Sequence, residues 1–373
     1  MRSQMDGGSN LFFGLVDQYL GDKIIVLLYK NRIDAFVYLL SRICYNKLVR
    51  YLKRYSFLYP IYHLLFYKLF LSVTCRAIKA KYSSIAFKGI WTNSNDILPL
   101  LAIRLSKEFH CPVHISVFDL PFTFSQCSME RRYLQINFEE WLKSVVSFDF
   151  ASDNMKSYIL ARASSCHNAN VIWSSPGLPS DLTPGEAEYN VRSAHKNIII
   201  VFCGSVRFRR EMRAFADALG LLSKKGKSCE FRIRTSKRSF PIKADWLPYI
   251  ANHDHLISEL KECDFAYSPM EFDAYNRLLA ETSFPGKFMD YLEAGLPIIA
   301  HAPSYAASYD FVKKNDLGIV IDSIDPEVIA TSLFGYLNNP MIIQTQKSNA
   351  ATASGLFYRK DERSLFFNKL FDI

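Results

Sequence analysis

The sequence predicts an α/β protein of two Rossmann-like, doubly wound parallel-sheet domains that face each other across a cleft. At 373 residues the chain is longer than one typical domain core. Apolar runs typical of buried strands alternate with helical stretches, and a Pro-, Gly- and Ser-rich stretch at 171–190 divides the two halves. Strands separated by helices form parallel sheets covered on both faces, and such sheets bind ligands at the carboxyl ends of their strands.

The elements follow this alternation in each half. In the first half we expect strands at 23–29, 83–91 and 111–119 and helices at 33–55, 60–80, 97–109, 128–145 and from 155. In the second half we expect strands at 197–205, 229–236, 264–269, 297–302 and 317–322 and helices at 211–224, 256–263, 287–294, 305–315 and 364–373. The predicted domains are 1–178 and 179–352, with 353–373 carrying a C-terminal helix that packs back on the first domain.

Positive charge is concentrated in one segment of the first half. Residues 23–88 contain thirteen Lys and Arg and a single acid, Asp34. The helical stretches there interleave Leu, Phe and Tyr with the basic residues, a pattern suited to the surface of an anionic bilayer. The alternative is that the apolar residues form a core and the basic residues only face solvent. We find no nucleic-acid-binding motif and expect no nucleic-acid partner.

Cysteine usage and the apolar segments bear on the compartment. The eight Cys are scattered without a C-x-x-C pair, which indicates reduced cytosolic thiols. The N-terminus lacks the apolar core of a signal peptide. The most apolar stretch, 55–75, is interrupted by Pro60, His63 and Lys68, so it is a poor membrane span.

The stretch FPGKFMDYLEAGLPII predicts a short helix between two turns. Pro285 suits its first turn and Gly295 its end. Gly286 would let a phosphate approach the free amides, Lys287 would add a positive charge, and Asp290 could accept hydrogen bonds from ribose hydroxyls. The alternative is an ordinary turn between a helix and a strand, with a surface Lys–Asp pair.

A second motif, IIIVFCGSVRFRREM, joins a buried strand to a basic loop. The strand breaks at Gly204 and Ser205, and Arg207, Arg209 and Arg210 follow at once. Amides and guanidinium groups at the carboxyl end of a strand can hold a diphosphate and stabilise its growing charge as it leaves. We expect at least one of the three arginines to be merely solvated.

These motifs resemble glycosyltransferases of the GT-B fold, group 1, family 4 type. The second half follows the family order: a linker, a strand with a glycine and a basic loop, HDHLISELKECDFAYSP, the Pro-Gly-Lys turn, and LGIVID. The resemblance implies an N-terminal acceptor domain and a C-terminal nucleotide-sugar domain. It implies transfer with retained configuration and without a metal or cofactor. It further implies a lipid-linked or oligosaccharide acceptor in bacterial polysaccharide assembly, and a cytoplasmic location, peripheral on the inner face of the membrane.

The sequence departs from the family pattern at several positions. The family has two glutamates eight positions apart, where this chain has Thr282 and Asp290, with Glu281 one residue away. The family's Arg and Lys after the glycine correspond here to Ser205 and Arg210, and Arg207 could compensate for the first. We predict Glu281, Gly204 and the residues of both motifs at the donor.

The acceptor residues are expected in the first half. DGGSN resembles the family's glycine loop, with Gly7 and Gly8 facing the acceptor. Asp119, at the end of a predicted strand, could orient or deprotonate an acceptor hydroxyl, or it could simply cap a turn. We predict Asp119, Arg210 and Lys287 as the catalytic residues.

The sequence contains two further patterns and is compatible with two alternative functions. We interpret His253 and His255 as polar loop residues. The sequence has no D-x-D motif, and Glu271-Phe-Asp273 is only a weak substitute for one, so we expect no metal site. An epimerase of nucleotide sugars is one alternative function. A non-catalytic membrane-associated scaffold is the other, favoured by the departures at Thr282 and Ser205.

Overall fold

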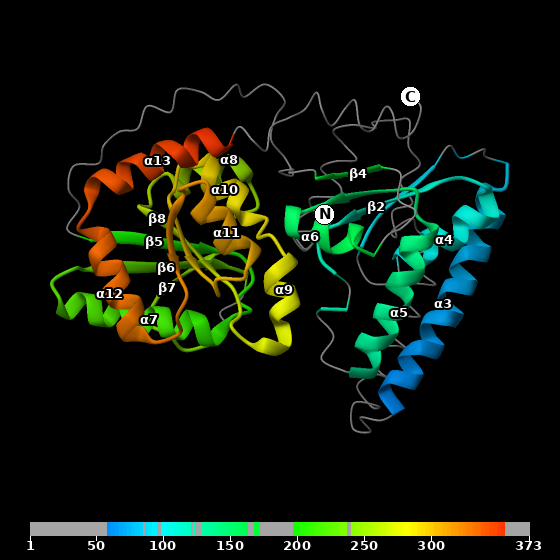
Figure 1. Ribbon diagram of the computed structural model, residues 1–373, viewed down its shortest axis with the longest axis horizontal. Coiled ribbons are helices and arrows are strands. Elements are labelled where there is room, and N and C mark those ends of the chain that lie inside the picture. Colours follow the sequence, from blue (N-terminus) through cyan, green and yellow to red (C-terminus); the bar gives the residue numbers. More distant parts are fainter. Residues whose placement is uncertain are drawn as a thin grey trace. The chain divides into compact units, whose positions relative to one another are not determined.

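The computed structural model describes residues 58–84, 87, 89–94, 98–120, 122–123, 128–162, 168–171, 197–236 and 240–354. These residues fall into two compact units, one within 58–171 and one within 197–354 (Figure 1). Each unit has its own parallel sheet and its own covering helices, so the predicted class of two parallel-sheet α/β domains is confirmed. A cleft between the two units stays a prediction.

The unit within 58–171 is built on a four-stranded parallel sheet in the order β1-β2-β3-β4. The strands are β1 Ile90–Asn93, β2 Val113–Val117, β3 Ser147–Phe150 and β4 Asn168–Val171. The helices are α3 Leu58–Tyr82, α4 Leu98–Phe109, α5 Ser128–Ser144 and α6 Asp153–Leu160. The helices predicted at 60–80, 97–109 and 128–145 are therefore confirmed within a few residues.

The strand expected at 83–91 was wrong in its bounds. Strand β1 begins only at Ile90, whose amide donates to the carbonyl of Pro112 at 2.9 Å. Its partner β2 begins at Val113, because Pro112 has no amide hydrogen to extend the ladder. Phe87 instead packs its ring on Phe109, with centroids 4.7 Å apart. Phe87, one of the apolar residues that suggested a longer strand, thus serves aromatic packing.

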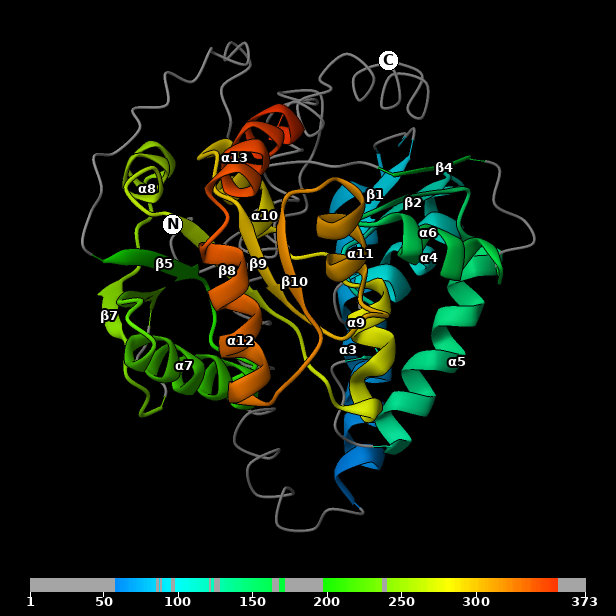
Figure 2. The same cartoon turned by 60° about the vertical axis from the view of Figure 1, so that its left-hand side comes forward.

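Helix α3 belongs to the core of this unit on one side. Leu71, Cys75 and Ile78 are buried against Leu101 and Leu105 of α4, and the two helices run side by side in Figure 2. Leu71, Cys75 and Ile78 are therefore core residues, as the alternative interpretation held, whereas Val73 is 44% exposed. The helix still carries four basic and no acidic residues along its length. None of the helices within the described residues is long and apolar enough to cross a membrane.

The unit within 197–354 has a six-stranded parallel sheet in the order β10-β9-β8-β5-β6-β7. The strands are β5 Ile198–Cys203, β6 Cys229–Thr235, β7 Asp245–Pro248, β8 Phe265–Pro269, β9 Ile298–His301 and β10 Gly318–Ile321. The helices are α7 Arg209–Lys224, α8 His253–Leu260, α9 Arg277–Thr282, α10 Lys287–Glu293, α11 Ala307–Lys314, α12 Pro326–Leu337 and α13 Pro340–Ser354, with the short 3-10 helix η3 at Ala274–Asn276.

Helices cover both faces of this sheet. Helices α7 and α12 lie on one face, and α8, α10, α11 and α13 lie on the other (Figure 1). Phe215 of α7 stacks on Tyr267 of β8, with ring centroids 3.9 Å apart. Phe288 and Leu292, the two core residues expected on α10, are fully buried. The expected doubly wound arrangement follows from these two apolar layers.

The strand order reverses between β5 and β8. From β5 the chain builds outward through β6 and β7, then returns to place β8 on the other side of β5 and continues through β9 and β10. The sequence analysis missed β7, α9, α12 and α13. The predicted boundary at 178–179 lies outside the described residues, as does most of 353–373, of which residues 353–354 close α13.

Candidate functional site

The loop after β5 lies where the strand order reverses, which is where open parallel sheets bind their ligands. Gly204 ends the strand with φ of +122°, a conformation that favours glycine, and its amide donates to the carbonyl of Arg234 at 2.9 Å. A Cβ at Gly204 would meet no atom within 4 Å, so the space beside it is open. The residues Ser205, Arg207 and Arg210, which follow it, are exposed.

Lys287, the first residue of α10, lies over the end of β5. Its Nζ is 3.9 Å from the centroid of the Phe202 ring. Burial lowers the pKa of Lys287 to about 7, the nearby Cys203 thiol opposes that shift, and the positive charge of Arg207 adds to it. Lys287 and Arg207 thus both contribute positive charge near the end of β5.

Asp290 lies one turn further along α10. Burial raises its pKa to about 6, although 26% of its side chain remains exposed, while the charge of His253 opposes the shift and that of Glu293 adds to it. The Nδ1 of His253 is 3.8 Å from the Asp290 carboxylate, and its Nε2 is 3.0 Å from that of Glu293. His253 is the first residue of α8 and is half-buried, so its interpretation as a polar loop residue was wrong.

Tyr291 ties α10 to β5. The hydroxyl oxygen of this fully buried side chain accepts a hydrogen bond from the amide of Cys203 at 2.9 Å. Because Lys287 and Tyr291 are four residues apart, both meet β5 from the same side of the helix. Helix α10 and the glycine loop are thereby held as one piece.

Replacing Tyr291 with Phe should destabilise the protein by about 1–3 kcal/mol, because it leaves the buried Cys203 amide without its acceptor. Urea unfolding monitored by circular dichroism measures this change. Tyr249→Phe, at an exposed position, is the matched control and should be neutral. Equal midpoints for the two variants would show that the bond does not hold α10 in place.

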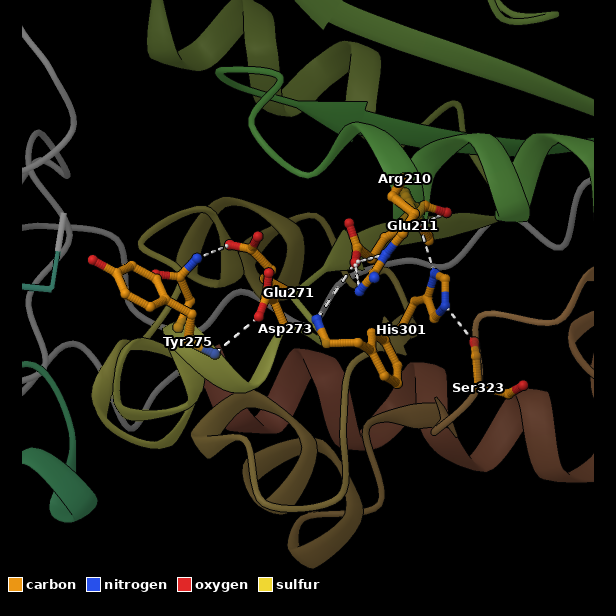
Figure 3. Close-up of polar contacts among 10 residues, drawn as sticks. Arg210, Glu211, Glu271, Asp273, Tyr275, His301 and Ser323 are labelled. Atoms are coloured by element: carbon orange, nitrogen blue, oxygen red, sulfur yellow. Dashed lines mark hydrogen bonds and ion pairs between the residues drawn. The ribbon is translucent and has the colours of Figure 1, made fainter. Parts of the chain in front are cut away.

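Arg210, in the first turn of α7, pairs with its neighbour Glu211. Its Nε and Nη2 are 3.1 and 3.0 Å from Oε1 of Glu211, a buried carboxylate (Figure 3). The amide of Phe272, after β8, donates to the same oxygen at 3.4 Å. Glu211 therefore links the loop after β5 to the loop after β8. Glu271 lies nearby, where burial and the charge of Glu211 raise its pKa.

A buried hydrogen-bond chain supports this edge of the sheet. Tyr267 lies 2.8 Å from Nδ1 of His301, and Nε2 of His301 lies 2.6 Å from the carbonyl of Ser323 (Figure 3). Burial lowers the pKa of His301 to about 4, so this imidazole is neutral at physiological pH. The chain fixes the ends of β8, β9 and β10 relative to one another.

The remaining donor residues of the sequence prediction are placed differently. Glu281 pairs with Arg277 along α9, with Nε and Oε1 2.7 Å apart. Gly286 is the N-cap of α10 with φ of −55°, so its backbone does not require glycine, and a Cβ there would meet nothing within 4 Å. Gly286 would therefore contribute to a binding site by leaving open space beside the start of α10, and not by its backbone conformation.

The predicted acceptor residues lie in the first half of the chain. Asp119 is half-buried and follows β2, and its carbonyl accepts a hydrogen bond from the Ser94 hydroxyl at 2.9 Å. The same hydroxyl accepts from the Phe118 amide at 3.3 Å, which fixes the turn that carries Asp119. Gly7 and Gly8 lie outside the described residues.

The structure thus brings Gly204, Arg207, Lys287 and Asp290 to the end of β5, with Arg210 held at Glu211 and Glu281 on α9. Sequence reasoning missed His253, Glu211 and Tyr291. Tyr291 could have been predicted, since it is four residues after Lys287 on the same helix. His253 contacts α10 from a helix that begins 34 residues earlier, and no local sequence pattern predicts that contact.

No family model matches the chain, and no curated protein sequence matches it. Solved structures do match. Trehalose-phosphate synthase (UDP-forming) from Burkholderia xenovorans, in complex with glucose-6-phosphate, is similar with a TM-score of 0.58 and 11% identity, over 82% of this chain and 78% of that one.

Two further structures agree. Sucrose-phosphate synthase from Thermosynechococcus elongatus matches with a TM-score of 0.54 and 12% identity, over 81% of this chain and 77% of that one. HepE from Anabaena, in complex with UDP-glucose, matches with a TM-score of 0.52 and 11% identity, over 74% and 76%. The chain therefore has the GT-B fold of glycosyltransferases, as the sequence resemblance implied.

Proposed function

We propose that the protein is a glycosyltransferase that moves a sugar from a nucleotide-sugar donor to a saccharide acceptor. The observation that carries the proposal is the position of Lys287 over the Phe202 ring, at the end of the strand where the sheet order reverses. A lysine held over a core ring is favoured in its charged form by a nearby anion. A diphosphate supplies that anion. The fold shared with HepE, which was solved with UDP-glucose, supports the same assignment.

The donor would lie along the strand ends with its diphosphate at Lys287, Arg207 and the open side of Gly204. Asp290, one turn further along α10, would accept hydrogen bonds from the ribose. Arg210, with 53% of its side chain exposed, would reach the diphosphate from its seat on Glu211. Glu281 could contact the donor only if its ion pair with Arg277 broke, so we assign it a minor role in donor binding.

The chemistry needs no metal or other cofactor on this proposal. The bond from the sugar C1 to the diphosphate oxygen breaks, and a bond from C1 to the acceptor oxygen forms with retained configuration. The negative charge that grows on the departing nucleoside diphosphate is stabilised by the fixed cations Lys287, Arg207 and Arg210. Asp119 would orient the acceptor hydroxyl or take its proton, with Gly7 and Gly8 beside the acceptor.

We further propose a lipid-linked acceptor and a peripheral position on the cytoplasmic face of the membrane, in surface polysaccharide assembly. Support comes from α3, on which Leu69 and Val73 are 68% and 44% exposed beside the exposed Lys68 and Arg76. Apolar side chains flanked by basic ones suit the interface of an anionic bilayer.

A panel of nucleotide sugars, incubated with and without membrane lipid extract, tests the proposal. Nucleoside diphosphate released only with lipid supports transfer to a lipid-linked acceptor, and release with soluble oligosaccharide supports transfer to that acceptor instead. An altered sugar without lipid would indicate an epimerase. Neither binding nor turnover would indicate a scaffold and contradict the proposal.

The protein should co-sediment with vesicles rich in phosphatidylglycerol and be released by about 0.5 M salt, because the attraction is screened. The double variant Lys68→Glu and Arg76→Glu on α3 should bind several-fold less. Lys224→Glu and Lys225→Glu on α7 change the net charge equally and should behave as the unmodified protein does. Equal losses in both variants would show that α3 is not the contact.

A further inference from the structure

We infer that His253 is a positioning residue that keeps the Asp290 carboxylate ionised and oriented for the ribose of the donor. The inference rests on the proposed function, since it concerns how the predicted ribose contact is held. It adds a residue from α8, an element that the donor motifs do not include.

The geometry favours the protonated form of His253. Its two ring nitrogens each face a carboxylate, Nδ1 at 3.8 Å from Asp290 and Nε2 at 3.0 Å from Glu293. A neutral imidazole carries only one N–H, so both contacts are favourable at once only when the ring is the imidazolium. Asp290 and Glu293 are three residues apart on α10 and therefore share one helix face, with His253 between them.

The surroundings make this cation necessary. The hydrogen bond with Glu293 raises the pKa of His253, burial opposes the shift, and the charges of Glu293, Asp290 and Asp254 add to it. For Asp290, burial favours the neutral acid, and Glu293 does so too, while His253 is the group that lowers its pKa. Without the imidazolium, the negative charges of Asp290 and Glu293 would repel each other, and Asp290 would take up a proton more readily.

The protonation state of Asp290 matters for the ligand. An ionised carboxylate accepts hydrogen bonds from two hydroxyls, whereas the acid has one oxygen occupied by its own proton. The other charged and titratable groups at this place are Lys287 on α10 and Cys203 at the end of β5. His253 forms ion pairs with Asp290 and Glu293, so its effect on the donor passes through these carboxylates.

The test measures nucleotide affinity by calorimetry from pH 5 to 8. UDP, GDP and ADP are tried in turn, each beside its 2′-deoxy form, and the one that binds is used throughout. In the unmodified protein, affinity falls as the pH drops below about 6, the pKa of Asp290. His253→Gln should shift this acid limb upward by about 0.5–1 pH unit. His253→Lys restores a cation and should return the limb toward its original position, a recovery that a merely structural role would not give.

Three other results have distinct meanings. If Asp290→Asn removes the acid limb but His253→Gln leaves it in place, the role of His253 is overturned and the proposed function stands. If the 2′-deoxy form and Asp290→Asn both bind like their parents at every pH, the ribose contact itself is absent. If none of the three nucleotides binds, the proposed function fails, and the inference fails with it.

Discussion

Replacing Lys287 with methionine is expected to weaken binding of the nucleotide-sugar donor about 100-fold while leaving the protein at least as stable at pH 7. The loss reflects a charged contact with the diphosphate in a partly buried site and corresponds to about 2.7 kcal/mol. Methionine is one atom shorter than lysine but is also unbranched, so its apolar end can still pack near the Phe202 ring, whose centroid is 3.9 Å from the present Nζ. The measurement is calorimetric affinity together with urea unfolding.

The stability half of this prediction follows from the sign of the pKa shift. The pKa of Lys287 is about 7 in the folded chain and that of an unfolded lysine is about 10.4. The unfolded chain therefore holds the proton more readily, and the lysine destabilises the fold fully below pH 7 and not at all above about 10.4. Methionine removes that cost. Lys314→Met, on the exposed surface of α11, is the control and should change neither quantity.

A residue that destabilises the folded chain but is needed for ligand binding, as we expect of Lys287, is typical of a functional site. If Lys287→Met were clearly less stable than the parent and bound the donor equally well, the lysine would be structural. That outcome would leave Arg207 and Arg210 as the only cations of the proposed donor site.

The pH dependence of kcat/KM is expected to be bell-shaped, with its maximum between about pH 6 and 7, the pKa values of Asp290 and Lys287. Below pH 6 Asp290 is protonated and loses its hydrogen bonds with the ribose. Above pH 7 Lys287 loses the charge that meets the diphosphate. Each limb should approach a slope of about tenfold per pH unit, and kcat/KM reports these groups in the free enzyme.

Two substitutions assign the limbs. Asp290→Asn should lower activity overall and remove the acid limb, and Lys287→Arg should retain activity to higher pH, because arginine stays charged. His253 titrates in the same range, but its loss moves the acid limb and does not remove it. A profile that is flat from pH 5 to 8, or limbs unmoved by both substitutions, would contradict the site.

The fold was largely predictable from the sequence because parallel sheets leave a strong pattern. Runs such as Ile198–Cys203 are apolar throughout, since the sheet is buried on both faces. Strand β7 was missed because its Asp245 and Pro248 are exposed at the sheet edge, where no apolar pattern is needed. Helices α12 and α13 were missed although Asp325 caps α12 through the Glu327 amide at 2.9 Å.

The donor site was predictable only where it is local in sequence. The glycine after β5 and the Pro-Gly-Lys turn can both be recognised in the sequence from their spacing and turn chemistry. The contacts that set their electrostatics do not: His253 reaches Asp290 from α8, and Glu211 reaches the Phe272 amide across 61 residues. Burial at the end of β5, which shifts the pKa values of Lys287 and Asp290 toward neutrality, arises only from the folded chain.

The central claim is that Lys287 and its neighbours bind a diphosphate at the end of β5. Its most direct test is the calorimetric affinity of a nucleoside diphosphate relative to its nucleoside, in the unmodified protein and in Lys287→Met. The claim predicts that the unmodified protein prefers the diphosphate by about 100-fold or more and that the variant loses most of this preference. An unchanged preference in the variant, or none in the unmodified protein, would contradict it.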